Sequence, residues 1–261
     1  MTRSIVAFAV LCAIFGTTFA AIAVGIDAGW PPLLAAGARF TLAGAIVLAL
    51  AAVRGELRRP ARADALRVAF VGLTVTTATF AALYTAERVV PSGLAALASA
   101  TSPAFAVVIA LALGRRRFDR WLLAGLVFGT VGVALIVGVG GAALGPAVAL
   151  GCLSIVVSEI AYAGGLTVTR DLAARLPILV IAGAQQTIGG LVLLTLSAAF
   201  EHALPARPFA GAGWLALAYL TVIASAGGHT LSIWLAGETS ATFATSWSYI
   251  APFIALAVGA V

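Results

Sequence analysis

The chain has 261 residues, of which 62% are hydrophobic and 9% charged, and its mean hydropathy is +1.14. This composition excludes an ordinary water-soluble domain and is typical of a protein that lies in a lipid bilayer. The net charge of +6 does not indicate nucleic-acid binding, because the arginines form short clusters between apolar stretches, as in loops that flank membrane helices. Cys12 and Cys152 lie within apolar runs, so neither a disulfide framework nor a metal site is predicted, and no cofactor is expected.

Nine apolar stretches of about 20 residues are long enough to cross a bilayer as helices. In chain order they are Ser4–Ile26, Pro32–Val53, Leu66–Ala86, Ser92–Leu113, Trp121–Val139, Pro146–Val168, Ile178–Ala199, Trp214–Leu235 and Ala241–Val261. Hydrocarbon cannot satisfy backbone polar groups and no alternating strand pattern occurs, so we predict an all-α membrane protein. The first stretch is too long for a signal peptide, and we expect it to remain in the mature protein.

The second and seventh stretches are copies of one sequence. Pro31 to Leu50 reads PPLLAAGARFTLAGAIVLAL, and Pro177 to Leu196 reads PILVIAGAQQTIGGLVLLTL. The register places Pro31 on Pro177, Gly37 on Gly183, Thr41 on Thr187 and Gly44 on Gly190. A second pair, SATSPAFAVVIALA around Pro103 and SYIAPFIALAVGAV around Pro252, follows at nearly the same separation. The chain therefore contains an internal repeat.

The number of stretches predicts that the two copies face opposite ways. Residues 1–140 hold five stretches, an odd number, so the second copy, residues 141–261, must enter the bilayer upside down. Many secondary transporters use such an inverted repeat of five helices to alternate a central site between two sides. The second copy holds only four stretches, so nine spans are seen where ten are expected. We expect the counterpart of Trp121–Val139 to be missing, through truncation or an abbreviated gene.

Arginines in the loops predict the orientation. Two clusters follow the second and fourth stretches, namely Arg54, Arg58, Arg59, Arg62 and Arg67, and Arg115, Arg116, Arg117 and Arg120. By the positive-inside rule both loops and the N-terminus are cytoplasmic. The loop after the sixth stretch carries Arg170 and Arg175, whereas the equivalent loop 27–30 has no basic residue, as inversion requires. We expect a multi-pass protein of the cell membrane, with the loops around Trp30, Gly141 and Arg207 outside.

Two charged residues inside the predicted helices are the first candidates for function, since each costs about 2.5–3.5 kcal/mol at a helix centre. Arg39 lies roughly 12 Å from the outer end of the second stretch by helical rise. It is expected to bind a carboxylate or phosphate of a substrate or to act in a gate, or else to fix helix packing. Glu159 lies about 20 Å into the sixth stretch. Proton coupling, a fixed ion pair with Arg39 and an interfacial position are all compatible with the sequence.

Other polar residues within the predicted membrane helices are each compatible with a functional role and with a structural one. His229 in the eighth stretch suits a proton relay, or packing through a hydrogen bond. Gln185 and Gln186 in the seventh suit substrate contacts or interhelical hydrogen bonds. Aromatic residues that suit a substrate cavity or the membrane interface are Tyr84, Tyr162, Trp247 and Tyr249. Pro103 and Pro252 each remove a helix hydrogen bond and are expected to kink equivalent helices around a central cavity.

The chain resembles the drug/metabolite transporter superfamily, in its two-repeat EamA branch. The residues that carry the resemblance are Phe15-Gly16 at the place of a Trp-Gly turn, Arg39 in PPLLAAGARFTLAG, the segment AALYTAERVVPSGLAALASATSP from Ala81 to Pro103, and Tyr162-Ala163 at the place of a Trp-Ala pair. These motifs extend over essentially the whole chain but consist mostly of small and apolar residues, so they imply a family and not a substrate.

The resemblance implies an inner-membrane secondary transporter that binds a small molecule and works by alternating access. Its expected activity is efflux of amino acids, related metabolites or hydrophobic compounds, either facilitative or coupled to protons. An intramembrane enzyme is the alternative in a different class, but the sequence has no His-Glu zinc spacing, no nucleophile elbow and no paired carboxylates on one face. A non-transporting membrane scaffold is the other alternative, and solute flux would separate the three.

Overall fold

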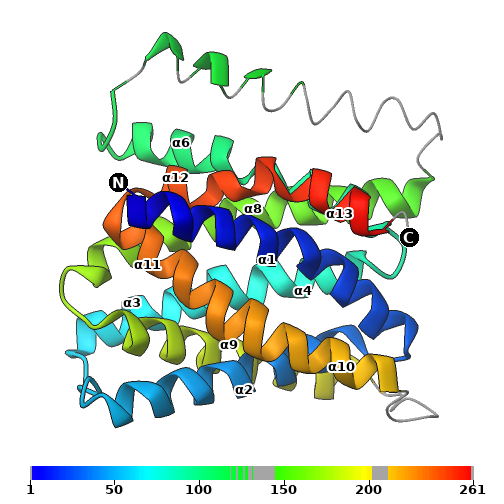
Figure 1. Ribbon diagram of the computed structural model, residues 1–261, viewed down its shortest axis with the longest axis horizontal. Helices are drawn as coiled ribbons and strands as arrows, with labels where there is room; N and C mark the ends of the chain where they lie inside the picture. Colours follow the sequence, from blue (N-terminus) through cyan, green and yellow to red (C-terminus); the bar gives the residue numbers. More distant parts are fainter. Residues whose placement is uncertain are drawn as a thin grey trace.

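The computed structural model describes residues 2–117, 119–121, 123–125, 127–128, 131, 145–201 and 211–259. Within these ranges the protein is helical and contains no strand, and its helices lie alongside one another in a bundle (Figure 1). The α-helices are α1 (Thr2–Asp27), α2 (Pro32–Val53), α3 (Arg62–Val71), α4 (Thr79–Ala86), α5 (Ser92–Ser99), α6 (Ser102–Ala112), α8 (Pro146–Ala173), α9 (Ile178–Phe200), α10 (Gly211–Tyr219), α11 (Thr230–Glu238), α12 (Ala241–Thr245) and α13 (Ala251–Gly259). Two π-helical segments, η1 (Gly72–Ala78) and η2 (Leu220–His229), and one 3₁₀ segment, η3 (Ser246–Tyr249), complete the list.

Seven helical stretches of the described residues are long and apolar enough to cross a membrane. They are Thr2–Asp27, Pro32–Val53, Arg62–Ala86, Ser92–Ala112, Pro146–Ala173, Ile178–Phe200 and Gly211–Glu238. Large apolar side chains on several of these helices are half exposed, among them Leu42, Leu66, Leu150 and Leu215. Such a surface requires a lipid environment, and the protein is a multi-pass membrane protein.

The two remaining predicted spans have different outcomes. Most of Trp121–Val139, including Gly129, lies outside the described residues, as do Gly141 and Arg207. The ninth span is divided among α12, η3 and α13, so that no single helix of it has the length of a membrane crossing. The described residues therefore contain seven of the nine predicted crossings as helical stretches of sufficient length.

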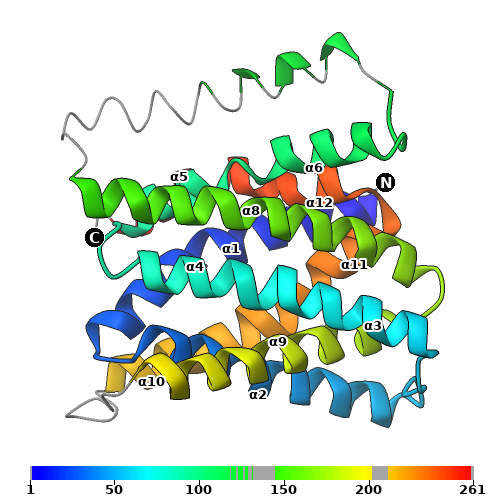
Figure 2. The same ribbon diagram turned by 180° about the vertical axis from the view of Figure 1, so that it is seen from behind.

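Helices α2 and α9, the two copies of the repeated sequence, run antiparallel and side by side (Figures 1 and 2). The closest approaches are Gly44 to Thr187, Gly190 to Thr41, Gly37 to Leu194 and Gly183 to Leu48. Each approach has a counterpart in which the two helices exchange roles, because Gly37 and Gly183 occupy one position of the repeat and Gly44 and Gly190 another. A Cβ at any of these glycines would overlap with the neighbouring helix, so small residues allow the close packing that is common between membrane helices.

Four spans depart from regular α-helix in pairs that correspond between the copies. The third and eighth spans contain the π-helical segments η1 and η2, of a kind often found at functional sites. The fourth span is interrupted between α5 and α6, immediately before Pro103. The ninth span changes from η3 to α13 immediately before Pro252. Because proline has no backbone N–H, each helix restarts at the residue before it.

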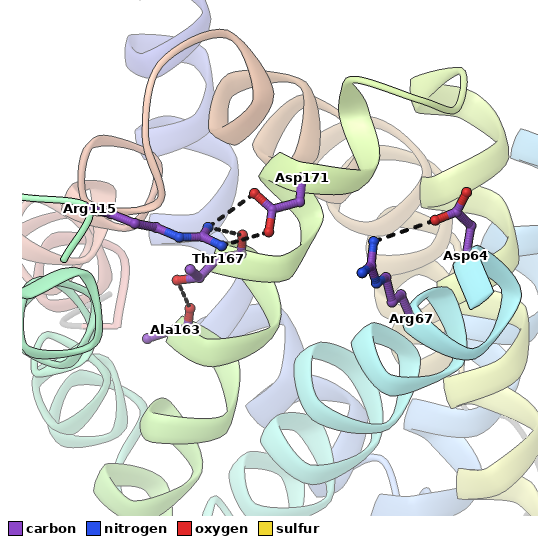
Figure 3. Close-up of polar contacts among 6 residues, drawn as sticks. All are labelled: Asp64, Arg67, Arg115, Ala163, Thr167 and Asp171. Atoms are coloured by element: carbon purple, nitrogen blue, oxygen red, sulfur yellow. Dashed lines mark hydrogen bonds and ion pairs between the residues drawn. The ribbon is translucent and has the colours of Figure 1, made fainter. Parts of the chain in front are cut away.

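Ionic contacts gather where α6 and α8 end and α3 begins (Figure 3). These helix ends lie at the end of the bundle that holds the N-terminus (Figure 1). Arg115 makes a two-pronged ion pair with Asp171 of α8, with distances of 3.1 and 2.7 Å, and its Nη1 also lies 3.4 Å from the Thr167 carbonyl oxygen. Asp64 at the start of α3 contacts Arg175 at 3.3 Å. The basic loops after the fourth and sixth spans and the start of the third span therefore lie on one side of the molecule.

The opposite end is held by contacts between the first and second halves of the chain. The Glu201 carboxylate accepts hydrogen bonds from the backbone N–H groups of Leu33 and Leu34 at 2.8 and 2.9 Å. It thereby satisfies two of the free donors at the start of α2 and places a negative charge at a helix N-terminus. Nearby, the rings of Trp30 and Trp214 meet edge to face at 5.5 Å.

Candidate functional site

A narrow cavity, with a volume of about 30 Å³, lies among the helices of both halves of the chain. It is lined by Phe15, Thr18 and Phe19 of α1, Arg39 of α2, Thr79, Phe80 and Leu83 of α4, Ser99 of α5, Glu159 and Tyr162 of α8, His229 of η2, and Trp247 of η3. A mostly apolar wall with a few convergent polar groups is typical of sites that bind small molecules. This cavity is therefore the candidate site.

Arg39 is fully buried, and its guanidinium group is held from several sides. Nε donates to Ser225 Oγ at 2.6 Å, and Nη1 donates to Tyr84 Oη at 3.1 Å. The guanidinium carbon lies 4.7 Å from the ring centre of Phe40 and 5.1 Å from that of Phe80, a cation–π arrangement. Nη2 is buried and donates to no acceptor. The group therefore retains a donor for an anionic ligand.

Glu159 faces the same cavity from α8 and is 4% exposed. Its carboxyl group lies beside the hydroxyl groups of Ser99 and Ser102. Ser99 is the last residue of α5 and Ser102 the first of α6, so both lie at the interruption of the fourth span. A hydroxyl group can donate to a carboxylate and so stabilise its negative charge. Within the described residues Arg39 and Glu159 form no ion pair with each other, so each group remains available to a ligand in the cavity.

Aromatic rings form much of the remaining wall. His229 lies 5.1, 5.3 and 5.2 Å from the ring centres of Phe15, Phe40 and Phe80. Trp247 meets Phe15 edge to face at 4.6 Å. The imidazole ring of His229 therefore packs against these aromatic rings, and its Nε2 has no hydrogen-bond partner. The wall suits an apolar or aromatic group of a ligand.

The predicted site residues separate into two groups in the structure. The cavity is lined by five of them, namely Arg39, Glu159, Tyr162, His229 and Trp247. Tyr84 is not a lining residue, but its hydroxyl group accepts a hydrogen bond from Arg39. Gln185, Gln186 and Tyr249 are not among the lining residues. The arrangement brings the two buried charges and three of the predicted aromatic residues to one place.

The two glutamines instead take part in helix packing. Gln185 Oε1 accepts a hydrogen bond of 2.6 Å from Thr76 of η1. Gln186 Nε2 donates to the Ala182 carbonyl of its own helix at 3.1 Å. One polar atom of each side chain, Gln185 Nε2 and Gln186 Oε1, is buried without a partner, so their predicted role in substrate contact stays a prediction.

Sequence analysis missed one buried acid near the site. Glu87, the first residue after α4, is only 8% exposed, and neither carboxylate oxygen has a hydrogen-bond partner. Burial raises the pKa of Glu87 well above its usual value, and the Arg39 guanidinium lowers it by a smaller amount. The signal in the sequence was an acid directly after an apolar span, but the adjacent Arg88 made an exposed loop the simpler reading.

Comparison with known proteins identifies relatives along the chain. Residues 2–138 match the model of the EamA-like transporter family. The "Uncharacterized inner membrane transporter YedA" of Escherichia coli K12 is 31% identical over 249 residues, which cover 94% of this chain and 78% of that protein. A "Probable terminal-alkyne amino-acid exporter" of Streptantibioticus cattleyicolor is 29% identical over 258 residues, covering 99% and 84%.

The fold also has a counterpart among solved structures. One crystal structure superposes with a TM-score of 0.75 over 99% of this chain and 87% of the other, at 21% identity. At this identity the likeness concerns the fold alone.

Proposed function

Because the chain belongs to the EamA-like transporter family, we propose that this membrane transporter exports a small zwitterionic solute of the amino-acid type through the Arg39 cavity. The observation that carries the proposal is the meeting of two buried, oppositely charged groups, Arg39 and Glu159, at one cavity with an aromatic wall. Each charge would be costly without a partner in the membrane interior. A solute with both charges would compensate both.

Three parts of the cavity would each bind one part of such a solute. The free Nη2 of Arg39 is a donor for a carboxylate. Glu159 is an acceptor for an ammonium group. The rings of Phe15 and Trp247 fit an apolar side chain. The printed name of the Streptantibioticus relative, an amino-acid exporter, supports this solute class.

We infer alternating access between two inverted copies, residues 1–140 and 141–261. The reciprocal approaches of α2 and α9 support it, since they are what a twofold axis between the copies would produce. A second exchange supports it too. Arg39 of α2 bonds Ser225 of η2, and Gln185 of α9 bonds Thr76 of η1, although Arg39 and Gln185 stand at the same position of the repeat. Motion of one copy against the other would open the cavity to each side in turn.

The proposed orientation has the N-terminus in the cytoplasm. It is supported by the gathering of Arg115, Arg175 and the start of α3 at the end of the bundle where the N-terminus lies. An arginine-rich end is expected to face the cytoplasm.

We also propose that Glu159 carries a proton when no solute ammonium is bound. Its place beside Ser99 and Ser102 supports both states, since a hydroxyl group can donate to a carboxylate or accept from a carboxylic acid. In that case Glu159→Gln removes the part of the response to an imposed proton gradient that depends on this carboxyl group, and it leaves solute exchange measurable.

The experiment is exchange of labelled propargylglycine, a terminal-alkyne amino acid, in vesicles that contain the purified protein. Arg39→Ala is expected to raise the solute concentration for half-maximal exchange about 10- to 100-fold, because a hydrogen bond to a charged group contributes roughly 1.5–3 kcal/mol. Arg88→Ala, which removes an exposed arginine, is the matched control. Equal effects of the two variants would refute the assignment of Arg39, and a wild type without exchange of this or any other amino acid tested would refute the solute class.

A further inference from the structure

Glu87 is a buried acid that the proposed transport site does not use. Its two carboxylate oxygens are buried and accept no hydrogen bond, although it is the first residue beyond the membrane span that ends at Ala86. An ionised carboxylate without donors is costly in such a place. Glu87 therefore either holds a proton or waits for a cationic partner.

The charged group that acts on Glu87 is Arg39. Helix α4 packs against α2, η1 and α8. The titratable or charged residues on these elements are Arg39 on α2 and Cys152, Glu159, Tyr162, Arg170 and Asp171 on α8, while α4 itself carries Tyr84 and η1 carries none. Of these, Arg39 is the cation that favours the ionised form of Glu87, and Tyr84 also interacts electrostatically with Glu87.

Tyr84 connects the two groups. It stands three residues before Glu87 on the same face of α4, and its hydroxyl group accepts a hydrogen bond from Arg39 Nη1. The guanidinium of Arg39 thus lines the cavity and also bonds the hydroxyl group of Tyr84, about one helical turn before Glu87. An anionic group in the cavity and an ionised Glu87 would both be acceptors for its unused Nη2 donor.

We propose that Glu87 is a titratable counter-ion of Arg39 that competes with the anionic group of the solute. The inference rests on the proposed function in one respect, that Arg39 binds this anionic group. When Glu87 is ionised, it compensates the guanidinium and weakens binding of the solute. When Glu87 takes a proton from water at the outer end of α4, the guanidinium is released to the solute carboxylate.

Binding of the solute is therefore coupled to proton uptake. One carboxylate enters the cavity and one proton neutralises Glu87, so the net charge around Arg39 stays constant. The affinity for the solute should fall as the pH rises through the range in which Glu87 ionises, by at most about tenfold per pH unit. Below that range the affinity should not depend on the ionisation of Glu87.

The first test counts protons taken up when purified protein binds propargylglycine, by calorimetry in buffers that differ in ionisation enthalpy. Solute binding is expected to take up more protons in wild type than in Glu87→Gln, by a fraction of a proton near neutral pH, because any proton that Glu159 releases is common to both proteins. Glu238→Gln, which removes an exposed acid at the end of α11, should behave as wild type. Glu159→Gln should retain the uptake that depends on Glu87. A Glu87→Gln variant with the wild-type proton count would overturn the proposal.

A second test needs no solute and separates this inference from the proposed function. Infrared difference spectra of the purified protein should show a carboxyl group that titrates and is lost in Glu87→Gln. In Arg39→Gln the same group should titrate at higher pH, because the cation that favours its ionised form is gone. If Arg39→Gln leaves this titration unchanged, the two groups are not coupled and the proposal fails. Failure of propargylglycine to bind while the titration does shift would refute only the solute class.

Discussion

The close packing of α2 on α9 predicts that an added methyl group at Gly44 destabilises the protein. A Cβ at Gly44 would lie 2.6 Å from the Thr187 backbone nitrogen and 2.7 Å from the Gly183 carbonyl oxygen. Both are backbone atoms, so the conflict is relieved only if the two helices move apart. Overpacking of this kind costs about 1–3 kcal/mol. The higher helix propensity of alanine stabilises the folded state by at most about 1 kcal/mol, so the free energy of unfolding should fall overall.

The assay is the free energy of unfolding in mixed micelles, measured for Gly44→Ala, for Gly190→Ala and for a control. Gly190 should respond like Gly44, since its Cβ would lie 2.5 Å from the Thr41 backbone nitrogen in the reciprocal contact. Gly25→Ala is the control, because no atom lies within 4 Å of a Cβ at this buried helical position. It should be neutral or slightly stabilising. If Gly44→Ala is as stable as Gly25→Ala, the close approach of the two helices is not as described.

Three further changes test separate parts of the structure. Glu201→Gln should cost about 1–2 kcal/mol of unfolding free energy, because it weakens two charge-assisted hydrogen bonds to backbone N–H groups; Glu238→Gln, at an exposed position, should cost less than about 0.5 kcal/mol in the same titration. Arg115→Ala should change the unfolding free energy by no more than about 1 kcal/mol and the loss should vanish at high salt, since its ion pair with Asp171 is partly exposed. Because burial raises the pKa of Glu87, the folded state binds this proton more tightly than the unfolded state, and stability should fall as the pH rises from the usual glutamate pKa toward the raised one. In a pH series of unfolding curves the slope should be smaller in Glu87→Gln than in wild type, by at most about 1.4 kcal/mol per pH unit, because any contribution of Glu159 is common to both proteins.

The membrane helices and one part of the site could be predicted from the sequence. Runs of about 20 apolar residues have few alternatives to a helix in a bilayer, so seven of the predicted spans appear as helical stretches. Arg39 and Glu159 could be singled out because a charge at that depth is rare, and their estimated depths differ by only roughly 8 Å. Both do line the cavity.

Rotation of each helix about its axis could not be predicted. Membrane helices that are apolar on all sides carry no period that separates the buried face from the lipid face, so the sequence left substrate contact and interhelical hydrogen bonds both open for Gln185 and Gln186. The π-helical segments were missed for a related reason. In η1 the Thr77 hydroxyl group donates a hydrogen bond of 3.1 Å to the Gly189 carbonyl oxygen. Gly189 lies on α9, so a contact that favours the π-helical turn comes from a distant part of the sequence. Burial of Glu87 likewise depends on packing between elements far apart in sequence.

The most direct test of the central claim asks whether the cavity is the transport site. Ser99 lines it and is 3% exposed, so Ser99→Cys, in a protein with Cys12 and Cys152 replaced by alanine, places a single reactive group there. Labelling by a small membrane-impermeant thiol reagent should stop propargylglycine exchange in vesicles, saturating solute should protect the cysteine, and access should be possible from both sides of the membrane. Complete labelling with undiminished exchange, or no protection by a solute that is transported, would contradict the account.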